Sequence, residues 1–110
     1  MKFNVGPFSC RVIIVEQPPI FDGKPCDGLI DFDSELIQIT MRLSGKRRLN
    51  VLLHEISHAW QFHFPMPCEE EGQCDFFANA AQAAMQDLLA QGGIDALNAM
   101  QPAAEEVGAA

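Results

Sequence analysis

The stretch that decides the fold is residues 46–63, which read KRRLNVLLHEISHAWQFH. Apolar residues recur in it at the 3.6-residue spacing of an amphipathic helix and fall on one side of a helical wheel. His54 and His58 fall on the opposite side. The pattern ends at Phe64, because a residue that precedes a proline is pushed out of the helical region. The sequence therefore predicts one long helix whose polar face carries two histidines.

Within this helix, residues 54–58 (HEISH) match the pattern H-E-x-x-H. Histidines four positions apart share one helix face, so the imidazoles of His54 and His58 can reach the same ion. Glu55 lies about 100° further round the helix, where a carboxylate can act as a general base. With this chain's own residue frequencies, chance predicts only on the order of 0.006 such matches. We therefore expect a zinc site with His54 and His58 as ligands and Glu55 as the catalytic base.

A catalytic zinc ion needs a third protein ligand and one open position. Glu71 and Asp75 lie four residues apart on a second predicted helix, so Glu71 can ligate while Asp75 accepts a hydrogen bond from a liganding histidine. The alternative is that the glutamates at 69–71 are only solvated residues at a helix N-terminus. His63 lies about 180° from His54 around the first helix, which favours a structural histidine.

The rest of the chain predicts an α+β fold, with a small antiparallel sheet followed by the zinc helix and a second long helix that carries the third ligand. A β-branched run predicts a buried strand, two further runs form a hairpin around Asp33 and Ser34, and the segment between them is a loop. A second helix ends at Gly92-Gly93, and a short third helix follows. The tail from Pro102 has no pattern and is expected to be disordered. The ranges, in chain order, are strand 8–16, loop 20–27, hairpin strands 29–32 and 35–41, and helices 68–90 and 94–100.

One of these strands is a candidate for substrate binding. Residues 36–41 alternate between apolar and polar and directly precede the zinc helix. If this strand lies at the edge of the sheet, an extended peptide can pair with the backbone of Gln38, Ile39 and Thr40 as an added strand. The alternative is an ordinary interior strand.

Composition excludes several classes of partner. The chain has 110 residues, which predicts a single domain over 1–110, and a formal net charge of −8. An acidic chain is a poor ligand for nucleic acid, and the basic run at 46–48 reads as a solvated helix face. No apolar run approaches the roughly 18 residues of a membrane span, and no signal peptide is visible. Four cysteines occur, none in C-x-x-C spacing, so a cytoplasmic protein with free thiols is expected.

The order of these motifs resembles the gluzincin metallopeptidases. The small size is similar to that of minigluzincins, and the segment 71–78 (EGQCDFFA) is similar to the E-x-x-A-N-x-F-A pattern of ImmA/IrrE-type regulatory peptidases, except at Cys74 and Asp75. The resemblance covers roughly residues 28–90 and implies zinc ligands His54, His58 and Glu71 in a minimal zincin. Full-size gluzincins stabilise the oxyanion with a Tyr or His from a later domain. The chain departs from them because it has no tyrosine and is expected to have no later domain.

The expected function is that of a zinc-dependent endopeptidase that hydrolyses peptide bonds with a zinc-bound water activated by Glu55. The lack of tyrosine suggests a latent or highly selective enzyme. The alternative is a non-enzymatic zinc-binding scaffold or interaction module, since small domains often need a metal to fold. A fourth ligand from Cys68 or Cys74 would favour that alternative.

Overall fold

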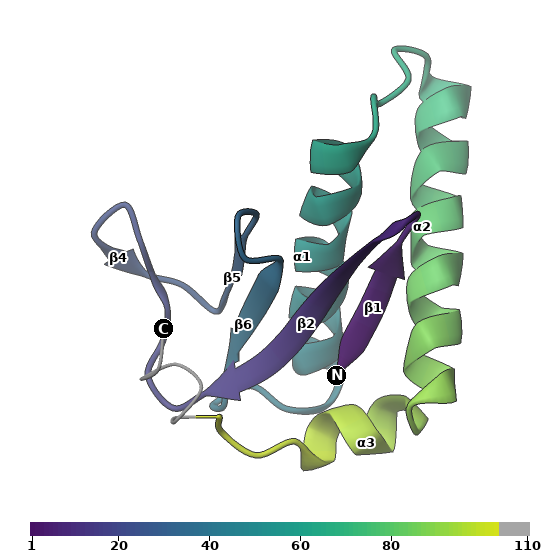
Figure 1. The fold of residues 1–110 in the computed structure, drawn as a ribbon. Helices are drawn as coiled ribbons and strands as arrows, with labels where there is room; N and C mark the ends of the chain where they lie inside the picture. The colour runs from purple at the N-terminus through teal and green to yellow at the C-terminus, as the bar shows by residue number, and fades with distance from the viewer. Residues whose placement is uncertain (104–110) are drawn as a thin grey trace.

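The structure, a computed structural model, describes residues 1–103 and forms a small sheet covered by three helices (Figure 1). The sheet has the strand order β1-β2-β6-β5, and a separate hairpin pairs β3 with β4. The strands are β1 (Lys2–Val5), β2 (Phe8–Val15), β3 (Ile20–Phe21), β4 (Lys24–Pro25), β5 (Gly28–Asp31) and β6 (Leu36–Thr40). The helices are α1 (Gly45–His63), α2 (Glu70–Ala90) and α3 (Gly93–Ala99).

The predicted α+β class is confirmed, but the prediction of a purely antiparallel sheet is wrong. β1 with β2 and β5 with β6 are antiparallel, whereas β2 and β6 run parallel from Arg11↔Leu36 to Val15↔Thr40. The second half of β2, residues 12–15, is buried on both faces. Such continuous apolar runs are typical of interior parallel strands. The segment predicted as a loop at 20–27 instead contains the β3–β4 hairpin, which projects from the sheet (Figure 1).

The prediction that residues 36–41 form an edge strand for substrate is also corrected by the structure. β6 is hydrogen-bonded to β2 on one side and to β5 on the other, so it is an interior strand. The backbone of Gln38, Ile39 and Thr40 is already taken up in these pairings. Thr40, one of the polar residues of the alternating pattern, is 1% exposed. The edge-strand prediction for these residues is therefore wrong, and the strand at this edge of the sheet is β5.

The helices lie close to their predicted ranges and pack on different parts of the sheet. α1 contributes Leu52, Ile56 and Ala59 to the buried core. α2 lies beside the opposite edge strand β1, where the Asn4 amide donates to Asp87 Oδ2 at 2.7 Å. In the ribbon, α1 therefore lies between α2 and the β5 side of the sheet (Figure 1). Among the described residues, no helix is both long enough and apolar enough to cross a membrane.

The start of α1 is held by the end of α3. Ser44 makes no side-chain cap, and the Gly45 amide donates instead to Asn98 Oδ1 at 2.8 Å. Arg48, expected on a solvated face, is 4% exposed and donates to the backbone oxygens of Leu43 and Leu97, both at 2.9 Å. A guanidinium buried with several carbonyl acceptors satisfies its donors without a carboxylate. The prediction of a solvated basic run is therefore wrong at this residue.

The predicted disordered tail is corrected at its beginning. Pro102 forms a parallel bridge with Ile14, and the Ala103 amide donates to the Ile14 oxygen at 2.8 Å. These contacts extend the edge of the sheet at the end of β2. The remainder of the predicted tail, 104–110, lies outside the described residues.

Candidate functional site

The H-E-x-x-H residues lie in the middle of α1, and burial divides them between two faces. Ile56 is buried in the core, while His54 and His58 are exposed on the side of the helix that faces away from it. The prediction that both histidines lie opposite the apolar stripe is confirmed. Their side chains are thus free to act on something outside the core.

The two histidine side chains converge. Nε2 of His54 lies 3.2 Å from Nε2 of His58, and the ring planes cross at 81°. Two nitrogens that each lie about 2.05 Å from one tetrahedral zinc ion are about 3.3 Å apart. The pair therefore fits two ligands of a single ion. The same separation suits a hydrogen bond between the two rings, so the pair alone does not identify a metal.

Glu55 lies beside this pair in a more enclosed position. Its side chain is 7% exposed, and burial raises the pKa of its carboxyl group, an effect that His54 and His58 partly oppose. The backbone of β5 approaches closely at Gly28, where an added Cβ would lie 2.5 Å from Val51 Cγ1 and 3.4 Å from Glu55 Cγ. The absence of a side chain at Gly28 is thus what lets β5 lie against this part of α1.

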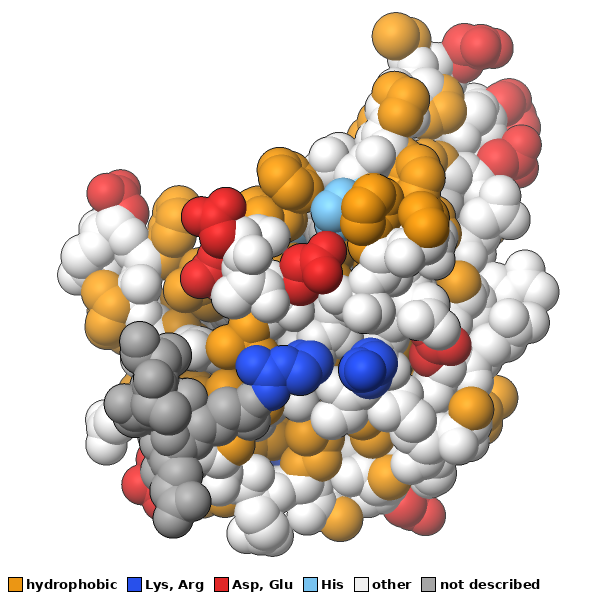
Figure 2. Space-filling view, in the orientation of Figure 1, with side chains coloured by type: hydrophobic (Ala, Val, Ile, Leu, Met, Phe, Trp, Pro, Cys, Tyr) orange, Lys and Arg blue, Asp and Glu red, His pale blue; other side chains and the backbone are white. Residues whose placement is uncertain are grey.

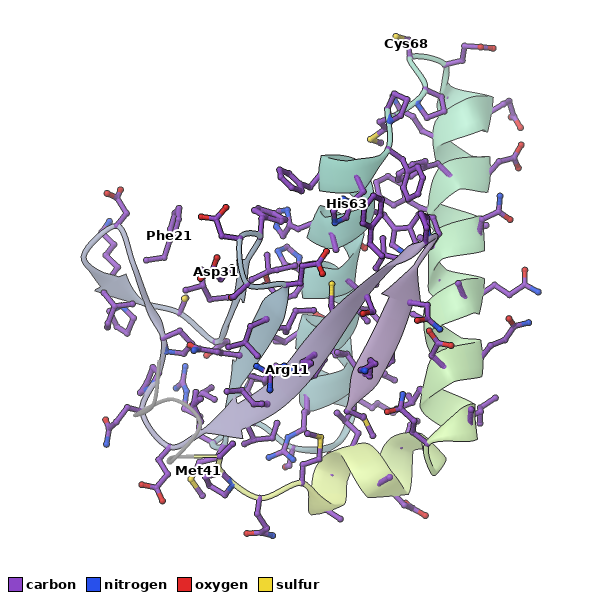
Figure 3. The ribbon with its side chains drawn as sticks, viewed as in Figure 1. Arg11, Phe21, Asp31, Met41, His63 and Cys68 are labelled. Carbon is purple, nitrogen blue, oxygen red and sulfur yellow. The ribbon has the colours of Figure 1, made fainter. Side chains whose placement is uncertain are left out.

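A cavity of about 330 Å³ lies between this face of α1 and the segments around β5. His54, Glu55 and His58 form its α1 side. The other side is mainly apolar and comes from the β3–β4 hairpin, from β5 and from the turn after it. Phe21 lies on the side of the hairpin that faces β5 (Figure 3). The residues that line this second side are Phe21, Cys26, Gly28, Leu29, Ile30 and Phe32.

β5 presents an open edge beside the cavity. The Asp27 oxygen accepts from the Thr40 amide, so Asp27 directs its carbonyl toward β6. Because backbone groups alternate in direction along an antiparallel strand, Leu29 also faces β6, while Gly28 and Ile30 face away from it. Among the described residues, no other strand pairs with that side.

Glu71 and Asp75 are not brought to the histidine pair. Both are exposed on the first turns of α2, which packs beside β1 on the far side of α1 (Figure 1). Within residues 1–103, no group of three or more His, Cys, Asp or Glu side chains is placed to hold a metal ion. The structure thus assembles His54, Glu55 and His58 and leaves the third ligand a prediction.

The two cysteines considered from the sequence as a fourth ligand, Cys68 and Cys74, do not line the cavity. Cys68 and Cys74 are free and exposed near the connection between α1 and α2, with Cys68 at its apex (Figure 3). The cysteine that lines the cavity is Cys26, whose Sγ donates to the Pro19 oxygen at 3.3 Å. Burial, together with the charges of Glu55 and Asp27, raises the pKa of the Cys26 thiol. Cys26 is thus the cysteine that lies in the same cavity as His54, Glu55 and His58.

His63 has a structural environment, as its position on the wheel predicts. Its ring stacks on Phe8 with centroids 3.9 Å apart, and Nε2 lies 3.5 Å from Glu35 Oε1. It therefore links the end of α1 to the start of β2.

Comparison of the chain with models of protein families, with curated proteins and with solved structures gives no match. The assignment of a function therefore depends on the motif and on the geometry of the site.

Proposed function

We propose that the protein is a zinc-dependent endopeptidase whose metal is held by His54 and His58 and whose general base is Glu55. The observation that carries this proposal is the convergence of the two Nε2 atoms at 3.2 Å beside a buried glutamate, at the wall of a cavity. A structural zinc site closes with four protein ligands and has no need of a base. A glutamate between two histidines is instead the arrangement of a hydrolytic site.

Zinc, when bound, supplies a Lewis acid that polarises a carbonyl group and makes water more acidic. The part of this chain is to hold and move a proton. Glu55 lines the cavity beside both histidines, so its carboxylate is placed to accept a proton from the attacking water. The same carboxyl group can then give the proton to the leaving amine.

We further propose Glu71 as the third zinc ligand, on the strength of the E-x-x-x-D spacing with Asp75. Glu71 would reach the histidine pair only if the first turns of α2 and the connection before them, residues 64–75, changed position. Such a change would make metal binding and activation a single event, in keeping with a latent enzyme.

For the substrate, the open edge of β5 supports binding as an added strand. Gly28 and Ile30 direct their backbone groups away from β6 and line the same cavity as Glu55. An extended peptide that paired with them would run past the histidine pair. This is the role that the sequence suggested for Gln38, Ile39 and Thr40, transferred to the neighbouring strand.

The proposal is tested by comparing wild type with Glu55→Gln. Glutamine keeps the size of the side chain and removes the base, so this variant should retain one zinc ion per chain by elemental analysis and lose hydrolysis of unfolded polypeptides. Glu16→Gln, at an exposed glutamate just after β2, is the matched control and should change neither property.

Unchanged hydrolysis by Glu55→Gln would overturn the proposed mechanism. Zinc binding with no hydrolysis by either protein would favour the second candidate, a non-enzymatic zinc module. That candidate draws support from the small size of the chain, since small domains often need a metal to fold.

A further inference from the structure

Exposed aromatic rings lie in the lining of the cavity and next to it. Phe21, at the end of β3, is 65% exposed. Phe32 stacks on Phe62 with ring centroids 4.4 Å apart, and Phe62 is itself 57% exposed. Phe21 and Phe32 both line the cavity, and Phe62, which comes from α1, extends this aromatic surface through its contact with Phe32. Exposed apolar surface that gathers in this way marks a binding site more often than a passive surface.

The dimensions of the cavity limit what can enter it. A volume of about 330 Å³ is at the lower end of the range for ligand pockets. One bulky side chain with its backbone fits such a space, and a folded partner does not. Since the open edge of β5 runs along the cavity, the occupant that suits both features is an extended peptide with one apolar side chain turned inward.

The rim of the cavity is acidic. Asp22 follows Phe21, and Asp31 and Asp33 stand on either side of Phe32. All three aspartates are exposed, and acidic side chains gather with hydrophobic ones over this part of the surface (Figure 2). Asp22 lies in the turn of the β3–β4 hairpin, and Asp31 Oδ1 accepts from the Asp33 and Ser34 amides in the turn after β5. The three acids therefore stand on or next to turns, each beside a phenylalanine that lines the cavity.

We propose that this cavity selects peptides with a bulky apolar residue, such as Phe or Leu, flanked by Lys or Arg. The apolar side chain occupies the space between Phe21 and Phe32. Its two neighbours in an extended peptide point away from the cavity and lie near the aspartates of the rim, where positive charge is favoured. This inference rests on the proposed function, since it names the class of substrate for that site.

Binding is measured separately from hydrolysis. Zinc-loaded Glu55→Gln protein is titrated by calorimetry with blocked nonapeptides that carry Phe, Leu, Ala or Asp at the centre and either Lys or Glu on both sides. We expect the Phe and Leu peptides with Lys flanks to bind at least about tenfold more tightly than the Ala peptide, because they bury more apolar surface. Peptides with Glu flanks should bind more weakly than peptides with Lys flanks. Raised salt should reduce this difference in affinity.

The variants Phe21→Ala and Phe32→Ala test the assigned residues. Each should reduce affinity for the Phe peptide several-fold and leave that for the Ala peptide almost unchanged. Leu89→Ala is the matched control, because Leu89 is an equally exposed apolar residue, at 69%, but lies on α2 away from the cavity. Phe21 lies on an exposed hairpin, so its replacement should leave the core intact.

Equal affinity for the Phe and Ala peptides, or preference for Glu flanks, would overturn this inference even if the wild-type protein cleaves peptides. Selective binding by Glu55→Gln without any cleavage by wild type would instead overturn the proposed function and leave the selectivity standing. The two failures are thus distinguishable.

Discussion

At the cavity beside α1, His54 and His58 already have their ring nitrogens 3.2 Å apart, and Glu55 is enclosed next to them. At the start of α2, by contrast, Glu71 and Asp75 are exposed and apart from that group. Both regions carry residues of one predicted zinc site. The residues of the first region are brought together without a metal, whereas those of the second region are not brought to them.

This difference shows where the spacing of residues in the sequence is sufficient to predict the geometry of a site. Within one helix, a separation of four residues fixes the relative position of two side chains, so H-E-x-x-H builds its own geometry. Glu71 belongs to another helix, and the connection at 64–69 with Pro65 and Pro67 decides where that helix begins. No spacing rule specifies the path of such a connection.

The largest expected effect lies at the assembled region. His54→Ala and His58→Ala should each abolish stoichiometric zinc binding and hydrolysis, because two converging nitrogens become one. His63→Ala is the control and should keep zinc, since His63 stacks on Phe8. Elemental analysis and calorimetric zinc titration measure the result, and loss of zinc in His63→Ala would show that the ligands are wrongly assigned.

The next largest effect on zinc affinity is expected from residues at the start of α2. It decides whether Glu71 and Asp75 contribute to the same zinc site as the histidine pair. Glu71→Ala should weaken zinc affinity severely, and Asp75→Ala by about 10–100-fold as a partner of a ligand. Glu69→Ala, the control, should have no effect. Zinc should also slow alkylation of Cys74, which neighbours Asp75 and is exposed here. If zinc binds to Glu71→Ala as tightly as to wild type, the two regions remain separate.

A smaller effect is expected at the open edge of β5. Ile30→Pro removes an amide that faces away from β6, so the fold and zinc should survive while kcat/KM falls about five- to tenfold, the equivalent of one backbone hydrogen bond. Ile30→Ala keeps the amide and controls for the lost side chain. Leu29→Pro should instead disturb the pairing with Gln38 and destabilise the sheet. Normal cleavage by folded, zinc-loaded Ile30→Pro would exclude substrate pairing at Ile30.

The smallest effect concerns the stability of the metal-free protein. Burial raises the pKa of Glu55 in the folded chain, so the protonated carboxyl group favours the folded state. This contribution to the free energy of unfolding is complete below the unfolded-state pKa and is lost as the pH rises through the folded-state pKa. Metal-free Glu55→Gln should therefore melt a few degrees above wild type at pH 7, and this difference should shrink toward pH 4. Thermal unfolding with a chelator measures it, and a difference that grows on acidification would contradict the pKa shift.

The sequence was informative wherever a pattern is local. The periodicity of α1, the end of α2 just before Gly92-Gly93 and the hairpin of β5 with β6 could all be predicted from neighbouring residues. The parallel pairing of β2 with β6 could not, because it depends on the path of residues 16–35. That error placed the open edge on β6 and hid the lining residues of the cavity. Gly28, at the start of a strand, was the one available signal of close backbone approach.

The hold of α3 on the start of α1 has a consequence for the order of folding. Asn98 Oδ1 accepts from the Gly45 amide, and the Leu97 carbonyl accepts from the Arg48 guanidinium. In each pair the acceptor lies about fifty positions further along the chain than the donor. Contacts of such sequence separation form late, because the long loop between them must first close. During synthesis, α1 leaves the ribosome well before its partner does. We therefore expect the histidine pair to take up its final position only after α3 has emerged, so a nascent chain that stops before Asn98 should not yet hold zinc in a native site.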